Sequence, residues 1–111
     1  MSNGIFSVNF KANTGAFGSG LVVVKDGKAN GGDPHYLYQG DVPVQSGAFK
    51  SQFKISKWLD GNTNVVRIDS YTLNAAGTVN YEAGTIELKG SVVGAPHLTM
   101  EIMGIKISDT V

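Results

Sequence analysis

The 111-residue sequence contains no cysteine and only two histidines. The first absence excludes disulfide frameworks, thiolate nucleophiles and zinc or iron–sulfur sites held by cysteine. The second leaves few side chains for a metal site, because a catalytic zinc usually uses three supported protein ligands. We therefore expect no metal and no cofactor.

Charge and long apolar runs are also scarce. Nine Lys and Arg balance nine Asp and Glu, which disfavours a direct nucleic-acid or anionic-membrane partner. The longest apolar run, Leu21 to Val24, is far shorter than the roughly 18 to 20 residues of a membrane-spanning helix. The first ten residues lack the pattern of a signal peptide. These features predict a cytoplasmic protein.

Glycine, in contrast, is abundant at 15 residues, about twice its common usage. Glycine-containing turns separate short segments in which apolar residues alternate with polar ones, which is typical of half-buried strands. The predicted strands are 4–11, 20–25, 28–30, 36–44, 48–58, 64–74, 85–93 and 97–107. The length suits one domain, residues 1–111. We expect an all-β, eight-stranded antiparallel up-and-down meander barrel, with a two-sheet sandwich as the alternative.

Several local features refine this prediction. Asp26-Gly27 is a dipeptide that type I′ hairpin turns prefer. Pro43 suits only an edge or an irregular strand end. Residues 48–58 also permit a helix, because Phe49 and Phe53 are four residues apart. Residues 12–20 are predicted to be a glycine-rich connection, and 75–77 and 82–84 to be turns.

The first candidate site is the segment from Lys28 to Gly40, "KANGGDPHYLYQG", in which Asp33 stands two residues before His35. Together they suggest a metal site or an oriented base. The only other histidine, His97, lies in a different hairpin, so we favour a turn in which Asp33 accepts backbone N–H groups and His35 lies at the surface.

Catalytic machinery is not visible elsewhere. The carboxylates are scattered singly, and no serine stands in a G-x-S-x-G context. Arg67, Asp69 and Tyr71 share one face of their predicted strand, which we expect to be solvated. We expect a protein that is not an enzyme.

An interaction surface is predicted on the last strand. Leu98, Met100 and Ile102 offer one face to the core, and the opposite face carries a second set of largely apolar residues: Thr99, Met103, Ile105 and Ile107. A strand that is apolar on both sides usually has both sides covered, so we predict a homodimer through this face. Trp58 and Leu59 are the alternative interface, unless Trp58 folds over the barrel end as a lid.

The stretches "NGIFSVNF", "GSGLVVVKDGKANGGD" and "YLYQG" occur in an order that resembles the signature of the GrlR family, small β-barrel negative regulators of type III secretion. The resemblance covers about the first forty residues well and the remainder as a strand pattern. It implies a calycin-like (lipocalin-like) eight-stranded barrel that dimerises and binds a protein. In the member after which the family is named, this partner is a helix-turn-helix transcriptional activator. It implies no enzyme activity. The matching positions, Gly31, Gly32, Asp33, Tyr38 and Gly40, are expected to have a structural role, with the glycines supplying backbone freedom.

One departure from the family pattern concerns the partner. In the family, partner binding is associated with an acidic run at the hairpin after the tyrosine-glycine strand, whereas residues 42–49 here are "VPVQSGAF". We therefore predict a homodimeric protein-binding regulator without assigning it the same activator. The alternative is a carrier of a small apolar ligand inside the barrel, which would fail if Phe6, Phe10, Phe49 and Phe53 filled the interior.

Overall fold

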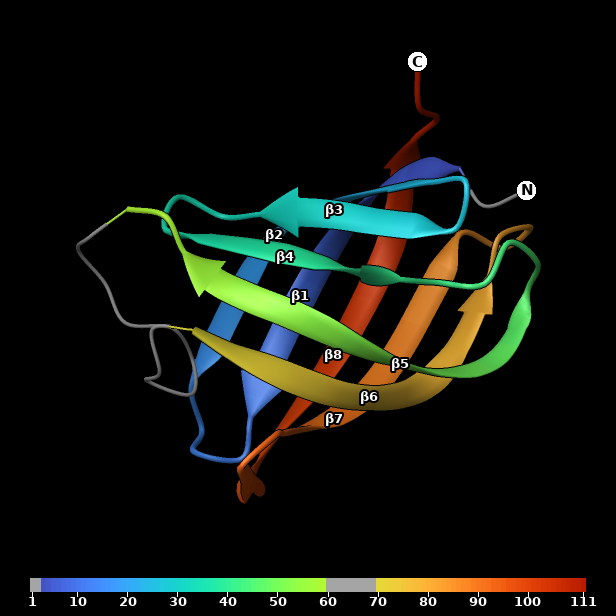
Figure 1. Ribbon diagram of the computed structural model, residues 1–111. Coiled ribbons are helices and arrows are strands. Elements are labelled where there is room, and N and C mark those ends of the chain that lie inside the picture. Colours follow the sequence, from blue (N-terminus) through green and yellow to red (C-terminus); the bar gives the residue numbers. More distant parts are fainter. Residues whose placement is uncertain (1–2, 60–69) are drawn as a thin grey trace.

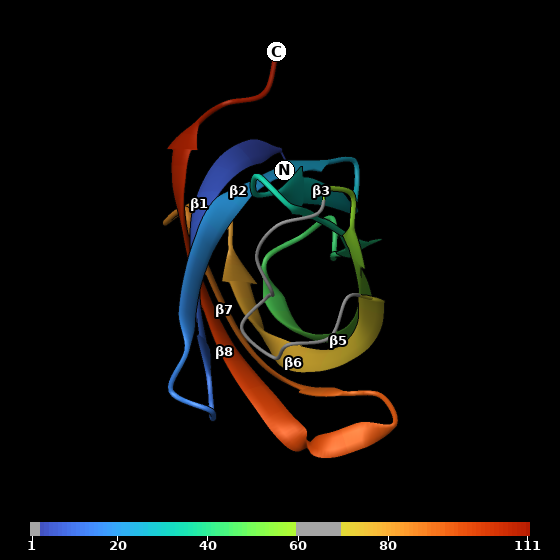
Figure 2. The ribbon, with the colours of Figure 1, turned by 90° about the vertical axis from the view of Figure 1, so that its left-hand side faces the viewer.

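The computed structural model describes residues 3–59 and 70–111, and their regular structure is entirely β. Eight strands follow one another along the chain: β1 (Gly4–Ala12), β2 (Phe17–Lys25), β3 (Lys28–Gly32), β4 (Tyr36–Asp41), β5 (Gly47–Lys57), β6 (Ser70–Asn80), β7 (Thr85–Val92) and β8 (Ala95–Ser108). Each strand pairs antiparallel with the next and β8 pairs with β1, which closes the barrel (Figures 1 and 2). The predicted up-and-down barrel is confirmed, and the sandwich alternative is wrong.

The local expectations for turns and strand ends are largely confirmed. Asp26 and Gly27, between β2 and β3, both have positive φ, at 53° and 78°. β4 ends at Asp41, before Pro43. Residues 47–57 form the strand β5, so the helical alternative is wrong. Within residues 3–59 and 70–111, no helix is long and apolar enough to cross a bilayer.

Two predicted connections are wrong. β2 already begins at Phe17, so residues 17–20 of the predicted connection belong to this strand. β6 continues through Ala75–Gly77, where a turn was expected. A Cβ atom at Gly77 would collide with the carbonyl group of Glu87 on β7, so this glycine permits close strand approach and does not mark a turn. Residues 64–69 of the predicted sixth strand lie outside the described residues.

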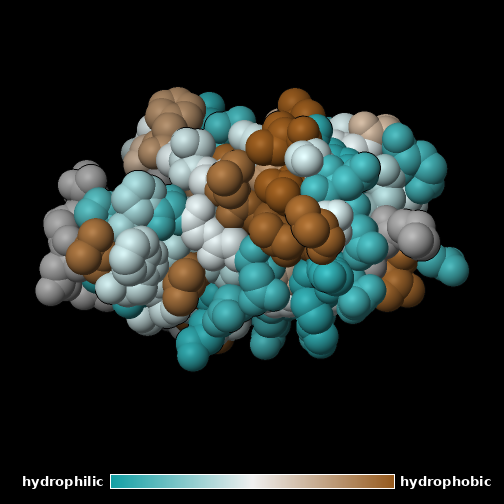
Figure 3. All heavy atoms as spheres, turned by 90° about the horizontal axis from the view of Figure 1, so that it is seen from above, coloured by the Kyte–Doolittle hydropathy of each residue, from teal (hydrophilic) through white to brown (hydrophobic). Residues whose placement is uncertain are grey.

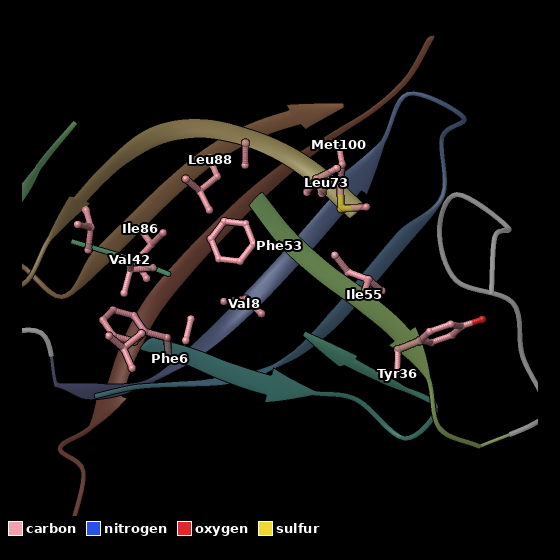
Figure 4. Close-up of a cluster of buried hydrophobic side chains, with 14 of the residues drawn as sticks. Phe6, Val8, Tyr36, Val42, Phe53, Ile55, Leu73, Ile86, Leu88 and Met100 are labelled. Carbon is pink, nitrogen blue, oxygen red and sulfur yellow. The ribbon is translucent and has the colours of Figure 1, made fainter. Parts of the chain in front are cut away.

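Alternate side chains of the strands point into the barrel and form a single core. The expected inward set of β1 is confirmed, with Phe6 and Val8 buried and Phe10 packed against them. Figure 4 shows Phe6, Phe53, Leu73 and Met100 projecting inward from different strands. The inward set of β8 is likewise Leu98, Met100, Ile102 and Gly104, as its alternation predicted.

Hydrogen bonds close one end of the barrel, where β4 leads into β5. The Tyr81 hydroxyl donates to the Pro43 carbonyl at 2.5 Å, and the Tyr81 backbone N–H donates to Ser46 Oγ at 2.9 Å. The Val42 N–H donates to the Gly27 carbonyl at 3.0 Å. We call this the packed end, because fully buried Phe6 and Val24 lie on the strands that meet there.

Candidate functional site

A cavity of about 310 Å³ lies inside the barrel. Phe10 and Phe53 line it without filling it, so large aromatic side chains do not close the whole interior. The apolar wall comes from strands on all sides of the barrel and includes Val8, Val22, Ile55, Leu73, Leu88 and Ile102. The polar side chains that line the cavity come mainly from the turn between β3 and β4 and from the adjoining parts of β4 and β6. We call the end of the barrel that contains Asp33, Tyr36, Tyr38 and Tyr71 the tyrosine end.

Asp33 organises the turn at the tyrosine end. Its Oδ1 atom accepts the backbone N–H groups of His35 and Tyr36, each at 2.8 Å, and its own N–H donates to the Tyr36 carbonyl at 3.0 Å. Its Oδ2 atom accepts the Tyr38 hydroxyl. Asp33 therefore caps the turn with one oxygen and engages a cavity side chain with the other.

His35 does not use its imidazole on Asp33. The ring Nδ1 lies 3.3 Å from the carbonyl oxygen of Leu59, and only the backbone N–H of His35 contacts the Asp33 carboxylate. In the part of the chain that the structure describes, no three His, Asp or Glu side chains come together in a way that would hold a metal ion. The absence of metal binding stays a prediction.

Tyr38 crosses the cavity from β4 towards β1 and β2. Its ring meets Phe10 edge to face, with centroids 5.1 Å apart, and a Cβ atom at Gly20 would lie 3.0 Å from it. Burial raises the pKa of Tyr38, and the hydrogen bond to the Asp33 carboxylate raises it further. The hydroxyl therefore stays neutral at physiological pH and acts as a donor.

Tyr71, near the start of β6, is a site residue that the sequence analysis placed wrongly. It was expected on a solvated face with Arg67 and Asp69, which lie outside the described residues, but it lines the cavity. Burial raises the pKa of Tyr71, and the nearby Tyr36 and Asp33 raise it further. The alternation of Tyr71, Leu73 and Ala75 along β6 was the signal that could have found it, since all three lie on the inner face.

The glycines that match the family signature leave room for neighbouring atoms. None of Gly31, Gly32 and Gly40 has a positive φ, so backbone freedom is not their role. A Cβ atom at Gly31 would collide with the Leu21 carbonyl, and one at Gly32 would lie 2.6 Å from the Tyr36 carbonyl oxygen. At Gly40 it would collide with the Phe53 ring. These glycines allow the close packing of β2 to β5 around the cavity.

Trp58 and Leu59 lie just after β5, against the turn that contains Asp33. The Trp58 N–H donates to the His35 carbonyl at 2.8 Å, and its ring Nε1–H donates to the Asp33 carbonyl at 3.1 Å. The side chain remains 53% exposed. The structure thus holds Trp58 beside the turn at the tyrosine end, apart from the outer face of β8.

The outer face of β8 continues into a wider apolar surface. Met103, Ile105 and Ile107 are 56%, 64% and 59% exposed, whereas Thr99 lies towards the other end of β8. The register places Ile105 beside Ser7 of β1, and Ser7 beside Leu21 of β2. We call Ile5, Leu21, Val23, Met103, Ile105 and Ile107 the apolar patch. Figure 3 shows apolar side chains gathered in this way on one face, with hydrophilic ones around them.

A comparison with protein families identifies the chain. A family model described as "T3SS negative regulator, GrlR" matches residues 1–109. The chain belongs to the GrlR family. No curated protein matches it.

Membership in the GrlR family extends the resemblance over almost the whole chain, beyond the forty residues in which it was visible. The family's description is that of a regulator of type III secretion. The cavity and the apolar patch are therefore features of a GrlR-family barrel.

Proposed function

We propose that this GrlR-family chain is a non-enzymatic, cytoplasmic negative regulator of type III secretion that forms a homodimer and binds a protein partner. The family match supports the regulatory role. The observation that supports self-association is the apolar patch on β8, β1 and β2, whose large side chains are about half exposed. Leaving such surface in water costs about 25 cal/mol per Å².

A second copy of the chain suits this patch because the patch carries no charge. The side chains between its apolar members are Ser7, Asn9 and Ser19, and charged residues stand at its margins, at Lys11, Lys25, Glu87 and Glu101. In a two-fold interface the same surface meets itself, so a charge at its centre would face a like charge. An uncharged apolar surface avoids that repulsion.

The dimer is tested by sedimentation velocity on the wild type, Ile105→Lys and Gln52→Lys. We expect the wild type to be a dimer at tens of micromolar and Ile105→Lys to be a folded monomer, because the new ammonium groups would be buried in the interface. Gln52 is exposed on β5, so Gln52→Lys adds the same charge to the outer face away from the patch and should remain dimeric. A monomeric wild type would refute the dimer, and a dimeric Ile105→Lys would refute this interface.

The regulatory role is tested with a reporter of type III secretion genes in the source bacterium. Deletion of the gene should raise expression, the wild type should restore repression, and Ile105→Lys should fail to restore it if the dimer is the active form. A protein partner captured by the wild type, such as a transcriptional regulator, counts as the target only if deletion of its own gene removes the effect. Unchanged expression on deletion contradicts the proposal.

A second candidate function, carriage of a small apolar ligand, is favoured by the cavity. Its volume of about 310 Å³ is at the lower end of the range for small-molecule sites, roughly 300 to 1,000 Å³.

A further inference from the structure

We infer that the cavity binds a compact amphipathic molecule with an apolar body and a cationic or hydrogen-bond-donating head group, which contacts Asp33 and Tyr71. This inference rests on the second candidate function and specifies its chemistry. It predicts that primary amines are preferred over carboxylic acids of the same length.

The first feature that supports this inference is the charge at the tyrosine end. The Asp33 carboxylate lines an otherwise largely apolar cavity. In residues 3–59 and 70–111, no lysine or arginine forms an ion pair with it. A negative charge beside an apolar cavity attracts a cation or a donor and repels an anion.

The second feature is an unused hydrogen-bond acceptor position on Asp33. A carboxylate offers about four acceptor positions. Three are used, by the N–H groups of His35 and Tyr36 and by the Tyr38 hydroxyl. A further donor can therefore be accepted without breaking the turn.

The third feature is the hydroxyl group of Tyr71. Its hydroxyl makes no hydrogen bond to another residue in the described part of the chain. The side chain lines the cavity, and it lies close enough to Asp33 for that carboxylate to raise its pKa. As a neutral hydroxyl it both donates and accepts. It is thus a second polar contact for the head group, beside the carboxylate.

The opposite part of the cavity determines the body of the ligand. Val24, Val42 and Ile86, on the segments that meet at the packed end, line it with apolar atoms, and Phe6 at that end is completely buried. A molecule oriented with its polar group towards Asp33 would place its hydrocarbon part against these side chains. The volume suits a short chain or a single ring better than a long acyl chain.

The test compares hexylamine, hexanol and hexanoate as probes, with affinities measured by NMR titration of the isotope-labelled protein. The amine should perturb the signals of cavity-lining residues and bind at least about tenfold more tightly than hexanoate, the scale of one charge-assisted hydrogen bond. Asp33→Asn, which retains an oxygen for the turn, should abolish this preference. Tyr71→Phe should weaken amine binding while leaving the fold intact, and it carries the test if Asp33→Asn does not fold.

Two controls separate the possible failures. Ile102→Phe, which fills part of the cavity, should weaken binding of all three probes, and Ile105→Lys on the apolar patch should change none of them. Equal binding of amine and carboxylate inside the cavity would overturn the proposed head group but leave the carrier function intact. Perturbations confined to the outer surface, or no binding at millimolar concentration, would overturn both.

Discussion

Each end of the barrel contains a tyrosine whose hydroxyl donates a hydrogen bond, but the acceptors differ. At the packed end the Tyr81 hydroxyl donates to a neutral backbone carbonyl, that of Pro43, and the surrounding interior is filled by apolar side chains such as Phe6. At the tyrosine end the Tyr38 hydroxyl donates to the Asp33 carboxylate, and the interior beside it is hollow.

This difference predicts that stability and the proposed ligand binding depend on different ends of one small fold. A filled end with neutral hydrogen bonds maximises apolar burial, whereas a charged group beside an empty volume is costly unless something binds there. Residues at the packed end should therefore contribute most to stability, and residues at the tyrosine end most to ligand specificity.

The largest effect is expected from removing a phenylalanine at each end. Phe6→Ala should lower the free energy of unfolding by about 3 to 5 kcal/mol, because the site is completely buried and tightly surrounded. Phe10→Ala should cost roughly half as much, since Phe10 is only partly buried and already borders the cavity. Urea unfolding at one fixed protein concentration, which keeps the contribution of the proposed self-association constant, measures both. Equal losses would contradict the difference between the ends.

A smaller loss is expected at Gly40, which lies between the two ends. Gly40→Ala should cost about 1 to 3 kcal/mol, because the added methyl group meets the Phe53 ring and must displace it. Gln39→Ala is the matched control on the exposed face of the same strand and should change stability by less than about 0.5 kcal/mol. If Gly40→Ala is as stable as the control, the ring is free to move into the cavity.

The smallest effect compares the two ends through their tyrosines. At neutral pH, Tyr81→Phe should cost about 1 kcal/mol for its lost hydrogen bond, and Tyr71→Phe should cost almost nothing because it loses none. Burial raises the pKa of both tyrosines above the ordinary value of 10.0.

The pH dependence follows from this rise. The unfolded chain loses the tyrosine proton near the ordinary pKa while the folded chain retains it, so the stabilisation is complete below about pH 10 and decreases above it. Wild-type stability should therefore fall as the pH rises above about 10, and each Phe variant should show a smaller fall. Identical pH profiles for the wild type and both variants would contradict the burial of these hydroxyls.

Much of the architecture was predictable because it depends on local pattern. Strict alternation in β1 and β8 determined which residues face the core, and Asp26-Gly27 determined a hairpin. The error at Gly77 has a physical cause. The sequence does not distinguish a glycine that is needed for a turn from one that is needed for close strand approach. The distinction depends on which atoms lie opposite the glycine, and at Gly77 these belong to the Glu87 carbonyl group.

The candidate site was predictable only in part. Asp33 and Tyr38 were found because they stand in one short segment, and the turn they form is local. Tyr71 was missed because it is far from them in sequence and reaches them only through the closure of the barrel. The apolar patch was partly found on β8, but its continuation over β1 and β2 required the register of three strands.

The sequence by itself determined an all-β chain, the inward side of its strands and the regulatory family to which it belongs, because alternation, turn residues and motif order are properties of neighbouring positions. Only the tertiary structure decided that the interior retains a cavity, that Tyr71 joins Asp33 at one end of it, and that three strands share one apolar outer face. Volume and convergence depend on how distant segments pack against one another, and no single stretch of the chain specifies them.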